Sequence, residues 1–458
     1  MEIADRILVA GAGVAGAASA EALLDRGRAV TVYDRADSER LRGLAERGAR
    51  TVSAPDFDPG LLDAIEQVVV SPGFPPHHPV AAAAARRGLE TYSEPELAWR
   101  LRGHGAPRWL AVTGTNGKTT TTTMLAAMLG AAGLRTAALG NIGEPLVFAA
   151  NGPYDALAVE LSSQQLHWSR LLAPEAGAML NLAPDHLAWH GAFDAYAEAK
   201  TAIWRGGAAV ANLDDPAVAA LAEHTPAPVT GFTLGEPEPG QFGVALGSLV
   251  DRTGSAPVPI CPVDRVRPAG AHNVANALAA AALARLAGVG HEAIGRALRE
   301  YTPEAHRNVT VAESGGVRWV DDSKATNPHA AAAALAAYEP IVWIAGGQLK
   351  GVDIDDLAAR FSGRMRAAIL IGQDRAEVAD ALARHAPGLP VTVLEGEDDS
   401  VMTDLVAAAA AYARPGDTVL LSPAAASFDM FDSYAHRGDA YAAAIRHTLG
   451  MDDRGGDE

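Results

Sequence analysis

The sequence predicts an α/β protein of three domains, each built on a mostly parallel β-sheet with flanking helices. Short apolar runs alternate with long Ala-rich segments of helical length, and this alternation is typical of βαβ units. The length of 458 residues corresponds to about three domains of roughly 150 residues each. Two glycine-rich loops each stand between an apolar run and a helical segment. They predict a Rossmann-like N-terminal domain and a central P-loop domain, and the later strand series predicts a Rossmann-like C-terminal domain.

The predicted strands are continuous apolar runs, as strands buried on both faces of a parallel sheet require. They cover residues 6–10, 30–33, 68–70, 110–112, 157–159, 317–320, 341–345, 367–371 and 418–421. Loops at 103–107 and 301–304 separate the domains, whose predicted bounds are 1–104, 105–301 and 302–450, followed by an acidic tail over 451–458. The Pro- and Gly-rich stretch 226–268 predicts a β-rich or looped excursion within the central domain.

The composition excludes several classes of function. The formal net charge is −18, because 55 acidic residues outnumber 37 basic ones, so sequence-independent binding of nucleic acid is not expected. No apolar run approaches the roughly 20 residues that a membrane helix needs. The single cysteine, Cys261, excludes an intramolecular disulfide and a Cys-rich metal site. We therefore expect a cytoplasmic protein that neither binds nucleic acid nor inserts into a membrane.

The first glycine loop, 11–16, follows the strand 6–10 and reads Gly-x-Gly-x-x-Gly. Its glycines let a pyrophosphate approach the backbone, and the helix that follows presents N–H groups to it. The next strand ends at Asp34, at about the spacing expected for a ribose-binding acid. The pattern requires only a diphosphate and a sugar, so NAD and a UDP-sugar both fit, and a tight turn without a ligand stays possible.

The second loop, 113–120, resembles a P-loop, although the strict pattern would need glycine at Val112. Gly114 and Gly117 allow its amides to curl around phosphates, and Lys118 can neutralise phosphate oxygens. This loop indicates ATP. A phosphate loop needs a metal-binding carboxylate downstream, and Glu160 ends a predicted strand at a suitable place.

Three other side chains have no role that the pattern alone assigns. His186 and His190 have helical His-x-x-x-His spacing, which could indicate a zinc site, but the glutamate of a zinc-protease motif is missing. The alternative to a zinc site is a polar patch on one side of a helix. Lys200 looks, from its local pattern, like an ordinary surface lysine.

Taken in order along nearly the whole chain, these motifs resemble the Mur ligase family of ATP-dependent, amide-bond-forming enzymes. The resemblance is carried by residues 113–120, 141–143, 160–163, 181–186, 200, 272–276 and 306–307. The C-terminal motifs 322–327, 346–351 and 421–427 resemble the branch that adds D-glutamate. Asn116 and the segment 323–325 argue against the branches that add L-alanine or a diamino acid.

The resemblance implies a reaction and its ligands. D-glutamate would be joined to UDP-N-acetylmuramoyl-L-alanine through an acyl phosphate, giving ADP and phosphate, in the synthesis of peptidoglycan precursors. ATP and two Mg²⁺ ions would be required, and a monomer is expected. All three substrates are anionic, so the cations should gather in the cleft and the acidic excess should lie outside it.

The resemblance also implies roles for individual residues. The catalytic residues would be Lys118, Glu160, His186, Lys200 and Lys324. ATP would be bound by Gly114, Thr115, Asn116, Gly117, Lys118, Thr119, Thr120, Asn273, Asn276, Arg307 and Asp322. The UDP-substrate would be bound by Gly11, Gly13, Val14, Ala15, Gly16, Asp34, Arg35, Ser71, Asn141, Ser162, Gln165 and His186. D-glutamate would be bound by Thr326, Lys350, Ser427, Phe428 and Tyr434. The metal ions would be held by Thr119, Glu160, His186 and Lys200, the last as a carbamate.

The sequence departs from the family pattern at Ala15, at Gln164 and at 183–184, although no proposed catalytic group is lost. Three alternatives stay open. A folylpolyglutamate-type ligase would begin at the ATP loop and so would lack the loop 11–16. An NAD-dependent dehydrogenase is favoured by Asp34 but leaves the P-loop and Glu160 unexplained. An ATP-binding regulatory or scaffold protein is the non-enzymatic alternative.

Overall fold

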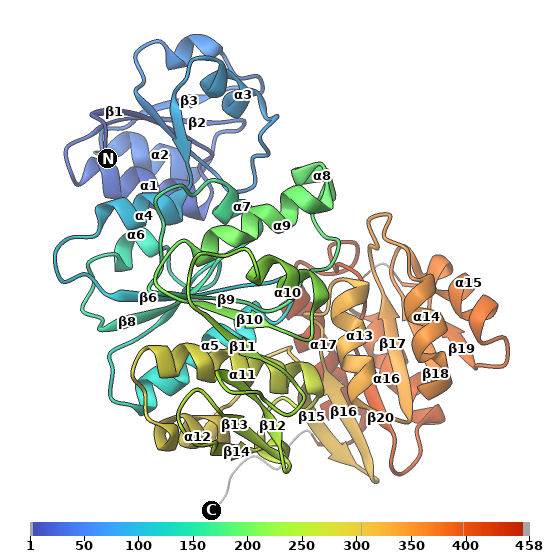
Figure 1. Cartoon of the computed structure of the whole chain (residues 1–458). Helices are drawn as coiled ribbons and strands as arrows, with labels where there is room; N and C mark the ends of the chain where they lie inside the picture. Colours follow the sequence, from blue (N-terminus) through green and yellow to red (C-terminus); the bar gives the residue numbers. More distant parts are fainter. Residues whose placement is uncertain (1–2, 304, 397, 452–458) are drawn as a thin grey trace, which may run out of the picture. The chain divides into compact units, whose positions relative to one another are not determined.

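The computed structural model describes residues 3–303, 305–396 and 398–451. It divides into two compact units, which are described separately (Figure 1). The first unit contains Met1–Val266 and Val274–Tyr301, and the second contains Arg267–Asn273 and Thr302–Glu458. The first unit holds two β-sheets and the second holds one, so the predicted α/β class with three sheets is confirmed. The bounds 1–104, 105–301 and 302–450 stay predictions.

The first sheet is fully parallel, with the strand order β3-β2-β1-β4-β5. Its strands are β1 (Arg6–Ala10), β2 (Ala29–Asp34), β3 (Arg50–Ser53), β4 (Gln67–Val70) and β5 (Glu90–Tyr92). The helices between and after them are α1 (Val14–Leu24), α2 (Glu39–Glu46), the 3₁₀ helix η1 (Pro59–Leu62), α3 (Pro79–Arg86) and α4 (Glu94–Leu101). Helices α1 and α2 pack on one face, and η1 and α3 pack on the other. The order of strands changes direction between β1 and β4, and such a switch point is where doubly wound sheets bind ligands.

The second sheet has nine strands in the order β14-β13-β12-β11-β10-β9-β6-β8-β7. They are β6 (Arg108–Thr113), β7 (Ala138–Gly140), β8 (Ala156–Glu160), β9 (Ala176–Met179), β10 (Ala209–Asn212), β11 (Val229–Phe232), β12 (Gln241–Ala245), β13 (Ser248–Asp251) and β14 (Val258–Pro262). Only the pairings of β13 are antiparallel. The β-rich excursion expected over 226–268 is therefore the β11–β14 end of this sheet.

Helices cover both faces of the second sheet. The helices of this part of the chain are α5 (Lys118–Ala131), α6 (Leu146–Ala149), α7 (Ser163–His167), α8 (Leu187–His190), α9 (Phe193–Thr201), η2 (Ala202–Trp204), α10 (Pro216–Ala222), η3 (Val263–Arg265), α11 (Ala271–Leu286) and α12 (His291–Glu300). On one face, α5, α11 and α12 enclose one apolar core. The core on the other face is continuous with that of the first sheet, so the two sheets share one apolar interior.

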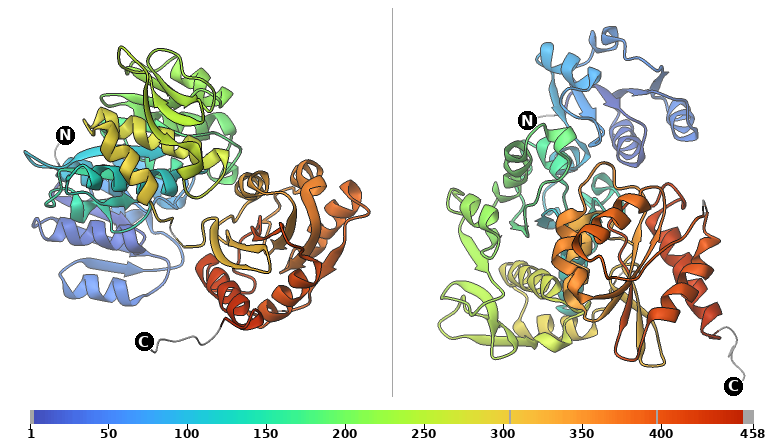
Figure 2. Two further views of the ribbon diagram at one scale, coloured as in Figure 1. Left: turned by 90° about the horizontal axis from the view of Figure 1, so that it is seen from below. Right: turned by 90° about the vertical axis from the view of Figure 1, so that its right-hand side faces the viewer.

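The third sheet has six strands in the order β15-β16-β20-β17-β18-β19, and only β15 is antiparallel. Its strands are β15 (Val309–Ser314), β16 (Val317–Asp321), β17 (Ile341–Gly346), β18 (Met365–Ile371), β19 (Val391–Val393) and β20 (Thr418–Leu421). Its helices are α13 (Pro328–Ala337), α14 (Asp355–Phe361), η4 (Ser362–Arg364), α15 (Arg375–His385), α16 (Val401–Tyr412) and α17 (Tyr434–Thr448). Helices α13–α15 pack on one face and α16 and α17 on the other, as Figure 2 shows from two further sides.

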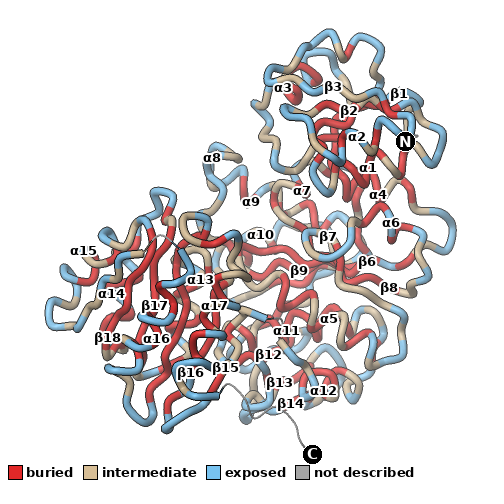
Figure 3. Tube along the Cα trace, turned by 180° about the vertical axis from the view of Figure 1, so that it is seen from behind, coloured by how far each residue is buried: buried red, intermediate tan, exposed pale blue. Residues whose placement is uncertain are grey.

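The central strands of all three sheets form the buried interior (Figure 3). Aromatic residues make up only 5% of the chain, and Ala, Val, Leu and Ile supply most of these cores. Among the described residues, no helix is long and apolar enough to cross a membrane. The predicted acidic tail, 451–458, lies outside the described residues except for Met451.

Candidate active site

The P-loop connects the buried end of β6 to the first turn of α5. Gly117 precedes α5 with φ +82°, and a Cβ atom at this position would lie 2.3 Å from Oδ1 of Asn276. Asn181, after β9, fixes the loop from the other side: its Oδ1 accepts from the Asn116 amide at 2.8 Å, and its Nδ2 donates to the Asn116 carbonyl at 3.1 Å. The loop shape is therefore held by side chains on both sides, and the N-terminus of α5 follows it directly, as in a phosphate site.

Glu160 lies at the carboxyl end of β8, beside the start of α5, and is 2% exposed. The Thr119 hydroxyl donates to its Oε2 at 2.6 Å, and the Asn141 amide donates to its Oε1 at 2.9 Å. The structure thus brings together three residues that the sequence predicted for the ATP, metal and UDP-substrate sites. A carboxylate and a hydroxyl oxygen suit Mg²⁺, which prefers hard oxygen ligands.

Two lysines converge on the same carbonyl of the P-loop. Lys118 Nζ donates to the Gly114 carbonyl at 3.0 Å and to the Thr115 carbonyl at 2.9 Å. Lys200 Nζ donates to the Gly114 carbonyl at 2.8 Å and to the Thr113 hydroxyl at 3.2 Å. The prediction of a surface position for Lys200 is wrong, because α9 places this side chain in the interior, where it is 1% exposed.

Burial, together with the charge of Lys118, holds the pKa of Lys200 well below its ordinary value. A lowered pKa increases the fraction of neutral amine. The neutral amine is the form that can react with CO₂ to give a carbamate, so the site fits the modification that the resemblance implied.

His186 precedes α8 in the left-handed conformation, with φ 52°, and its side chain is half exposed. Desolvation lowers the pKa of its imidazole, and the charges of Lys118 and Lys200 lower it further, against the opposing effect of Asp185. His190 instead points its Nε2 to the Ser163 hydroxyl at 2.9 Å. Among the described residues, no group of three or more His, Cys, Asp and Glu side chains is arranged to hold a metal ion. Thr119 and Glu160 therefore meet, whereas the predicted pairing of His186 with a carbamylated Lys200 at a second metal ion stays a prediction.

The first sheet presents the predicted UDP-substrate loop at its switch point. Gly11 has φ +96°, and a Cβ atom there would lie 2.9 Å from the Cβ of Ser71. A Cβ atom at Gly16 would lie 1.8 Å from the carbonyl oxygen of Gly11, so the third glycine is required by close packing. The Asp34 carboxylate accepts from the Ala12 amide at 2.5 Å, so this acid holds the loop itself.

The remaining residues predicted for the UDP-substrate lie around this loop and on α7. Ser162 and Gln165 form a capping box at the start of α7, in which each side chain accepts from the other residue's backbone N–H. Val14 is exposed at the start of α1, and Arg35 Nε donates a long 3.5 Å hydrogen bond to the Pro55 carbonyl.

The second unit contains the five residues predicted for D-glutamate, and the two aromatic rings among them each lie beside a lysine. Lys324 Nζ lies 3.6 Å from the centre of the Tyr434 ring, and Lys350 Nζ lies 5.7 Å from that of Phe428. Ser427 is buried next to Phe428, and Thr326 follows Lys324 by two residues. Two cations, two hydroxyls and two aromatic rings are thus available in this unit.

The residues predicted for ATP are divided between the two units. Asn276 and the P-loop belong to the first unit, whereas Asn273, Arg307 and Asp322 belong to the second. Burial raises the pKa of Asp322 to about 7, against the effect of a hydrogen bond from Ser422 at 2.8 Å.

Among the buried ionic groups that escaped the sequence prediction, two join segments that are distant in sequence. Arg437, within α17, donates to the Ser323 hydroxyl and carbonyl at 2.9 Å and to the Ala425 carbonyl at 3.2 Å. It therefore joins two of the C-terminal motifs. No local signal separates Arg437 from an exposed helical arginine, since its partners are distant in sequence.

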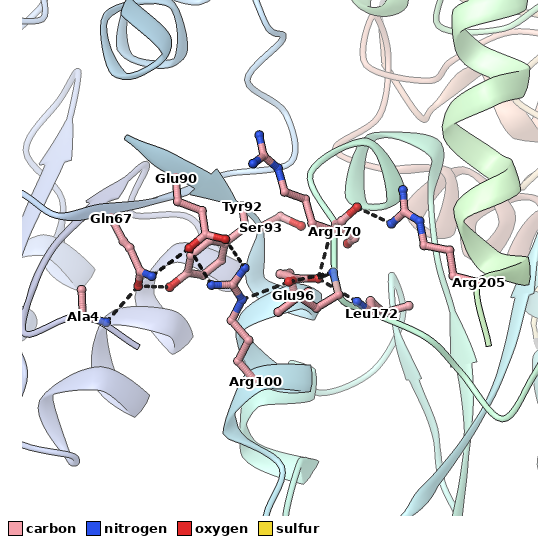
Figure 4. Close-up of polar contacts among 12 residues, drawn as sticks. Ala4, Gln67, Glu90, Tyr92, Ser93, Glu96, Arg100, Arg170, Leu172 and Arg205 are labelled. Atoms are coloured by element: carbon pink, nitrogen blue, oxygen red, sulfur yellow. Dashed lines mark hydrogen bonds and ion pairs between the residues drawn. The ribbon is translucent and has the colours of Figure 1, made fainter. Parts of the chain in front are cut away.

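The second missed group is centred on Glu96 of α4, which is fully buried (Figure 4). Its carboxylate accepts from the backbone N–H groups of 170–172 at 2.9–3.1 Å and from Arg100 Nε at 2.9 Å. Arg100 also makes a bidentate ion pair with Glu90, at 2.6 and 2.9 Å. The network fixes the segment after α7 to the first sheet, and so supports the helix that carries Gln165.

Comparison with known proteins assigns the chain to a family. Three family models match in order: the MurD-like N-terminal domain of Mur ligases over residues 5–93, the Mur ligase middle domain over 112–284, and the Mur ligase glutamate ligase domain over 306–425. Two curated relatives are UDP-N-acetylmuramoylalanine–D-glutamate ligases. The one from Streptomyces coelicolor is 50% identical, covering 96% of this chain and 97% of the relative. The one from Thermobifida fusca is 50% identical, covering 97% and 99%.

Solved structures show the same fold at lower identity. A UDP-N-acetylmuramate-alanine ligase from Thermotoga maritima matches with a TM-score of 0.59 at 16% identity, covering 97% of this chain and 99% of that one. A MurF from Acinetobacter baumannii matches with a TM-score of 0.59 at 18% identity, covering 96% and 93%. Half of the residues are identical to the curated relatives over almost the full length, and the three domain matches follow in order. The chain therefore belongs to the Mur ligase family, in the group of its D-glutamate-adding ligases.

Proposed function

We propose that the protein joins D-glutamate to UDP-N-acetylmuramoyl-L-alanine at the expense of ATP, in the synthesis of peptidoglycan precursors. The observation that carries this proposal is the 50% identity, over nearly the whole chain, to relatives named for this activity. The side chains needed for it are present: a P-loop with a buried Thr119–Glu160 pair, and a second unit with Lys324 and Lys350 beside aromatic rings.

ATP would be held by the P-loop amides and by Lys118. In the described structure the Lys118 ammonium donates to two loop carbonyls, which are weaker acceptors than charged phosphate oxygens. We expect the ammonium to exchange these carbonyls for phosphate when ATP binds. The L-alanyl carboxylate of the UDP-substrate would then attack the γ-phosphorus, and ADP would leave. The amine of D-glutamate would attack the carbonyl of the resulting acyl phosphate, forming the amide bond and releasing phosphate.

Two Mg²⁺ ions are part of the proposal. Thr119 and Glu160 would hold one ion, and His186 with a carbamylated Lys200 would hold the other. Bound Mg²⁺ neutralises charge on a transferring phosphoryl group. The buried Lys200 supports the second site, because an ammonium in that position would repel a cation whereas a carbamate would bind one.

D-glutamate would be recognised in the second unit. Its two carboxylates suit the ammonium groups of Lys324 and Lys350, and the hydroxyls of Thr326 and Ser427 could donate to the same oxygens. Phe428, which is 68% exposed, and Tyr434 would cover the aliphatic part of the ligand.

Three further expectations belong to this proposal. We propose domains at 1–104, 105–301 and 302–450, a monomer, and a cytoplasmic location. Size-exclusion chromatography with light scattering would test the monomer.

The decisive experiment measures phosphate release with ATP, Mg²⁺ and the UDP-muramoyl-L-alanine precursor. Release should depend on D-glutamate and should be far slower with L-glutamate or L-alanine. A Lys118→Ala variant should lose the activity, since it lacks the phosphate-binding ammonium. Phosphate release that is independent of D-glutamate, or unaffected by Lys118→Ala, would overturn the proposed function.

A further inference from the structure

Four side chains on α7, on α8 and beside them form an aromatic cluster that the proposed reaction does not use. They are His167, Trp168, Trp189 and His190, which stand in the sequence as the dipeptides His-Trp and Trp-His. The His167 and Trp189 rings meet edge to face, with centres 5.0 Å apart and planes at 85°. Trp189 also lies 4.4 Å from the His190 ring and 6.4 Å from the Trp168 ring. Figure 1 shows the two short helices that carry the cluster.

Both indoles of this cluster donate to the same loop of the first sheet. Trp189 Nε1 donates to the Gly73 carbonyl at 3.2 Å, and Trp168 Nε1 donates to the neighbouring Phe74 carbonyl at 3.1 Å. This loop follows β4 and begins at Ser71, whose Cβ faces Gly11 of the glycine loop. The Phe74 amide donates back to the Ser71 carbonyl at 2.9 Å, so a shift of the loop at 73–74 is passed on to Ser71.

The other contacts of the cluster reach the second sheet. His190 Nε2 lies 2.9 Å from the Ser163 hydroxyl at the start of α7, the helix that carries Gln165. Trp189 belongs to α8, which begins directly after His186. The cluster therefore touches three segments, and each of them carries a residue predicted for the UDP-substrate: Ser71, Gln165 or His186.

The two indole hydrogen bonds fix the loop at 73–74, which apolar packing of the rings alone would not do. Trp168 and Trp189 are both only partly buried, so little of the stability of the unit should depend on their rings alone. Phenylalanine would supply most of the same apolar contact, whereas only tryptophan can donate to a loop carbonyl through its ring nitrogen. Fixing a binding loop before the ligand arrives lowers the ordering cost of binding.

We propose that Trp168 and Trp189 are positioning residues for the UDP-substrate pocket, and that they hold the Ser71 loop in register with the segments carrying Gln165 and His186. The inference rests on the proposed function, because it assumes that a UDP-muramoyl precursor is the ligand of this pocket. It concerns the precursor only, since the indole hydrogen bonds found among the described residues go to Gly73 and Phe74 and not to the P-loop.

The test compares Trp168→Phe, Trp189→Phe and the double variant with the wild type. Calorimetric titration with the UDP-muramoyl-L-alanine precursor alone, without ATP or D-glutamate, measures Kd directly. Each single variant should weaken precursor binding about three- to tenfold, the range expected for one lost hydrogen bond. The double variant should weaken it by less than the product of the two, because both indoles fix one loop. Kd for ATP should stay unchanged, and in the assay KM for the precursor should rise more than kcat falls.

Trp204→Phe is the matched control. Trp204 is a buried tryptophan whose Nε1 donates to the Gly177 carbonyl at 3.1 Å, a bond of the same kind that ends on β9 and not on the Ser71 loop. Trp204→Phe should lower the melting temperature and leave the precursor Kd unchanged. Trp168→Phe and Trp189→Phe should raise the precursor Kd and leave the melting temperature nearly unchanged. If the pocket variants bind the precursor as the wild type does, or weaken ATP equally, the inference is wrong while the proposed function stands. If the wild type itself does not bind the precursor, both are wrong.

Discussion

The buried carboxylate of Glu96 should be among the most sensitive positions of the first unit. In Glu96→Gln, the amide oxygen can replace Oε2, which accepts from the backbone N–H groups of 170–172. The amide NH₂ group then takes the place of Oε1 and faces the Arg100 Nε–H donor, which now meets another donor. Arg100 is left with Glu90 as its one carboxylate partner in the described network.

The expected loss of stability follows from these contacts. One charge-assisted hydrogen bond disappears, at a cost of roughly 1.5–3 kcal/mol, and three others weaken from charged to neutral, at about 0.5 kcal/mol each. We therefore expect the free energy of unfolding of the first unit to fall by roughly 3–4 kcal/mol, within the range for a broken buried ion pair. Glu66→Gln is the control, since its ion pair with Arg6 at 3.0 Å is exposed on both sides and should change stability by less than about 1 kcal/mol.

Urea unfolding followed by tryptophan fluorescence would measure the difference. Five of the seven tryptophans, at 99, 109, 168, 189 and 204, belong to the first unit. A shift for Glu96→Gln no larger than that for Glu66→Gln would refute the reasoning, because it would mean that the buried Glu96 charge stabilises the protein no more than an exposed ion pair does.

Three further predictions concern the two glycine loops and a buried acid. Gly16→Ala should destabilise the first unit by about 2–3 kcal/mol in thermal melts, because its Cβ would lie 1.8 Å from the Gly11 carbonyl oxygen. The control is Gly13→Ala, whose Cβ would meet nothing within 4 Å and which should melt like the wild type. Gly117→Ala should weaken ATP binding at least about tenfold in calorimetry, since φ +82° and the 2.3 Å approach to Asn276 both disfavour a side chain. Gly133→Ala is the control for backbone strain alone, because Gly133 has φ +83° but its Cβ would meet nothing within 4 Å. An equal loss of ATP binding in Gly133→Ala would contradict the prediction. Burial raises the pKa of Glu94 to about 7 in the folded protein, so the folded state binds the proton more tightly than the unfolded state. Stability should therefore fall as pH rises from about 4.5 to about 7 and be level above it, and Glu94→Gln should flatten this part of the urea-unfolding profile; an unchanged slope would count against it.

The sequence predicted the architecture well, because strands buried on both faces and glycines at strand–helix turns are local patterns. The runs at 6–10 and 418–421 are β1 and β20 with the expected bounds. The P-loop and the strand ending at Glu160 also follow from local order along the chain. Their meeting through Thr119 could be expected, since both lie at the carboxyl ends of neighbouring parallel strands.

The parts that the sequence did not predict depend on contacts between distant segments. The local pattern around Lys200 is that of an ordinary surface lysine, and only the packing of α9 against the P-loop buries it. Glu96 and Arg437 resemble the many charged residues of exposed helices until their partners, many positions away, are in place. A single sequence carries no signal for such pairs, so both the ionic networks and the tryptophan contacts required the structure.

The short β13–β14 end of the nine-stranded sheet also bears on how this protein behaves at high concentration. An outermost strand with free N–H groups can pair with another chain and start aggregation. Strand β14 carries Pro259 and Pro262, which have no N–H to offer, and α12 packs against it so closely that a Cβ atom at Gly295 would lie 2.4 Å from the Ile260 carbonyl oxygen. At the opposite edge, β7 is only three residues long. Two prolines and one closely packed helix at one edge, and a short strand at the other, thus disfavour pairing of this broad sheet with strands of another chain. These features should help the protein to remain free of aggregates while it binds three separate substrates.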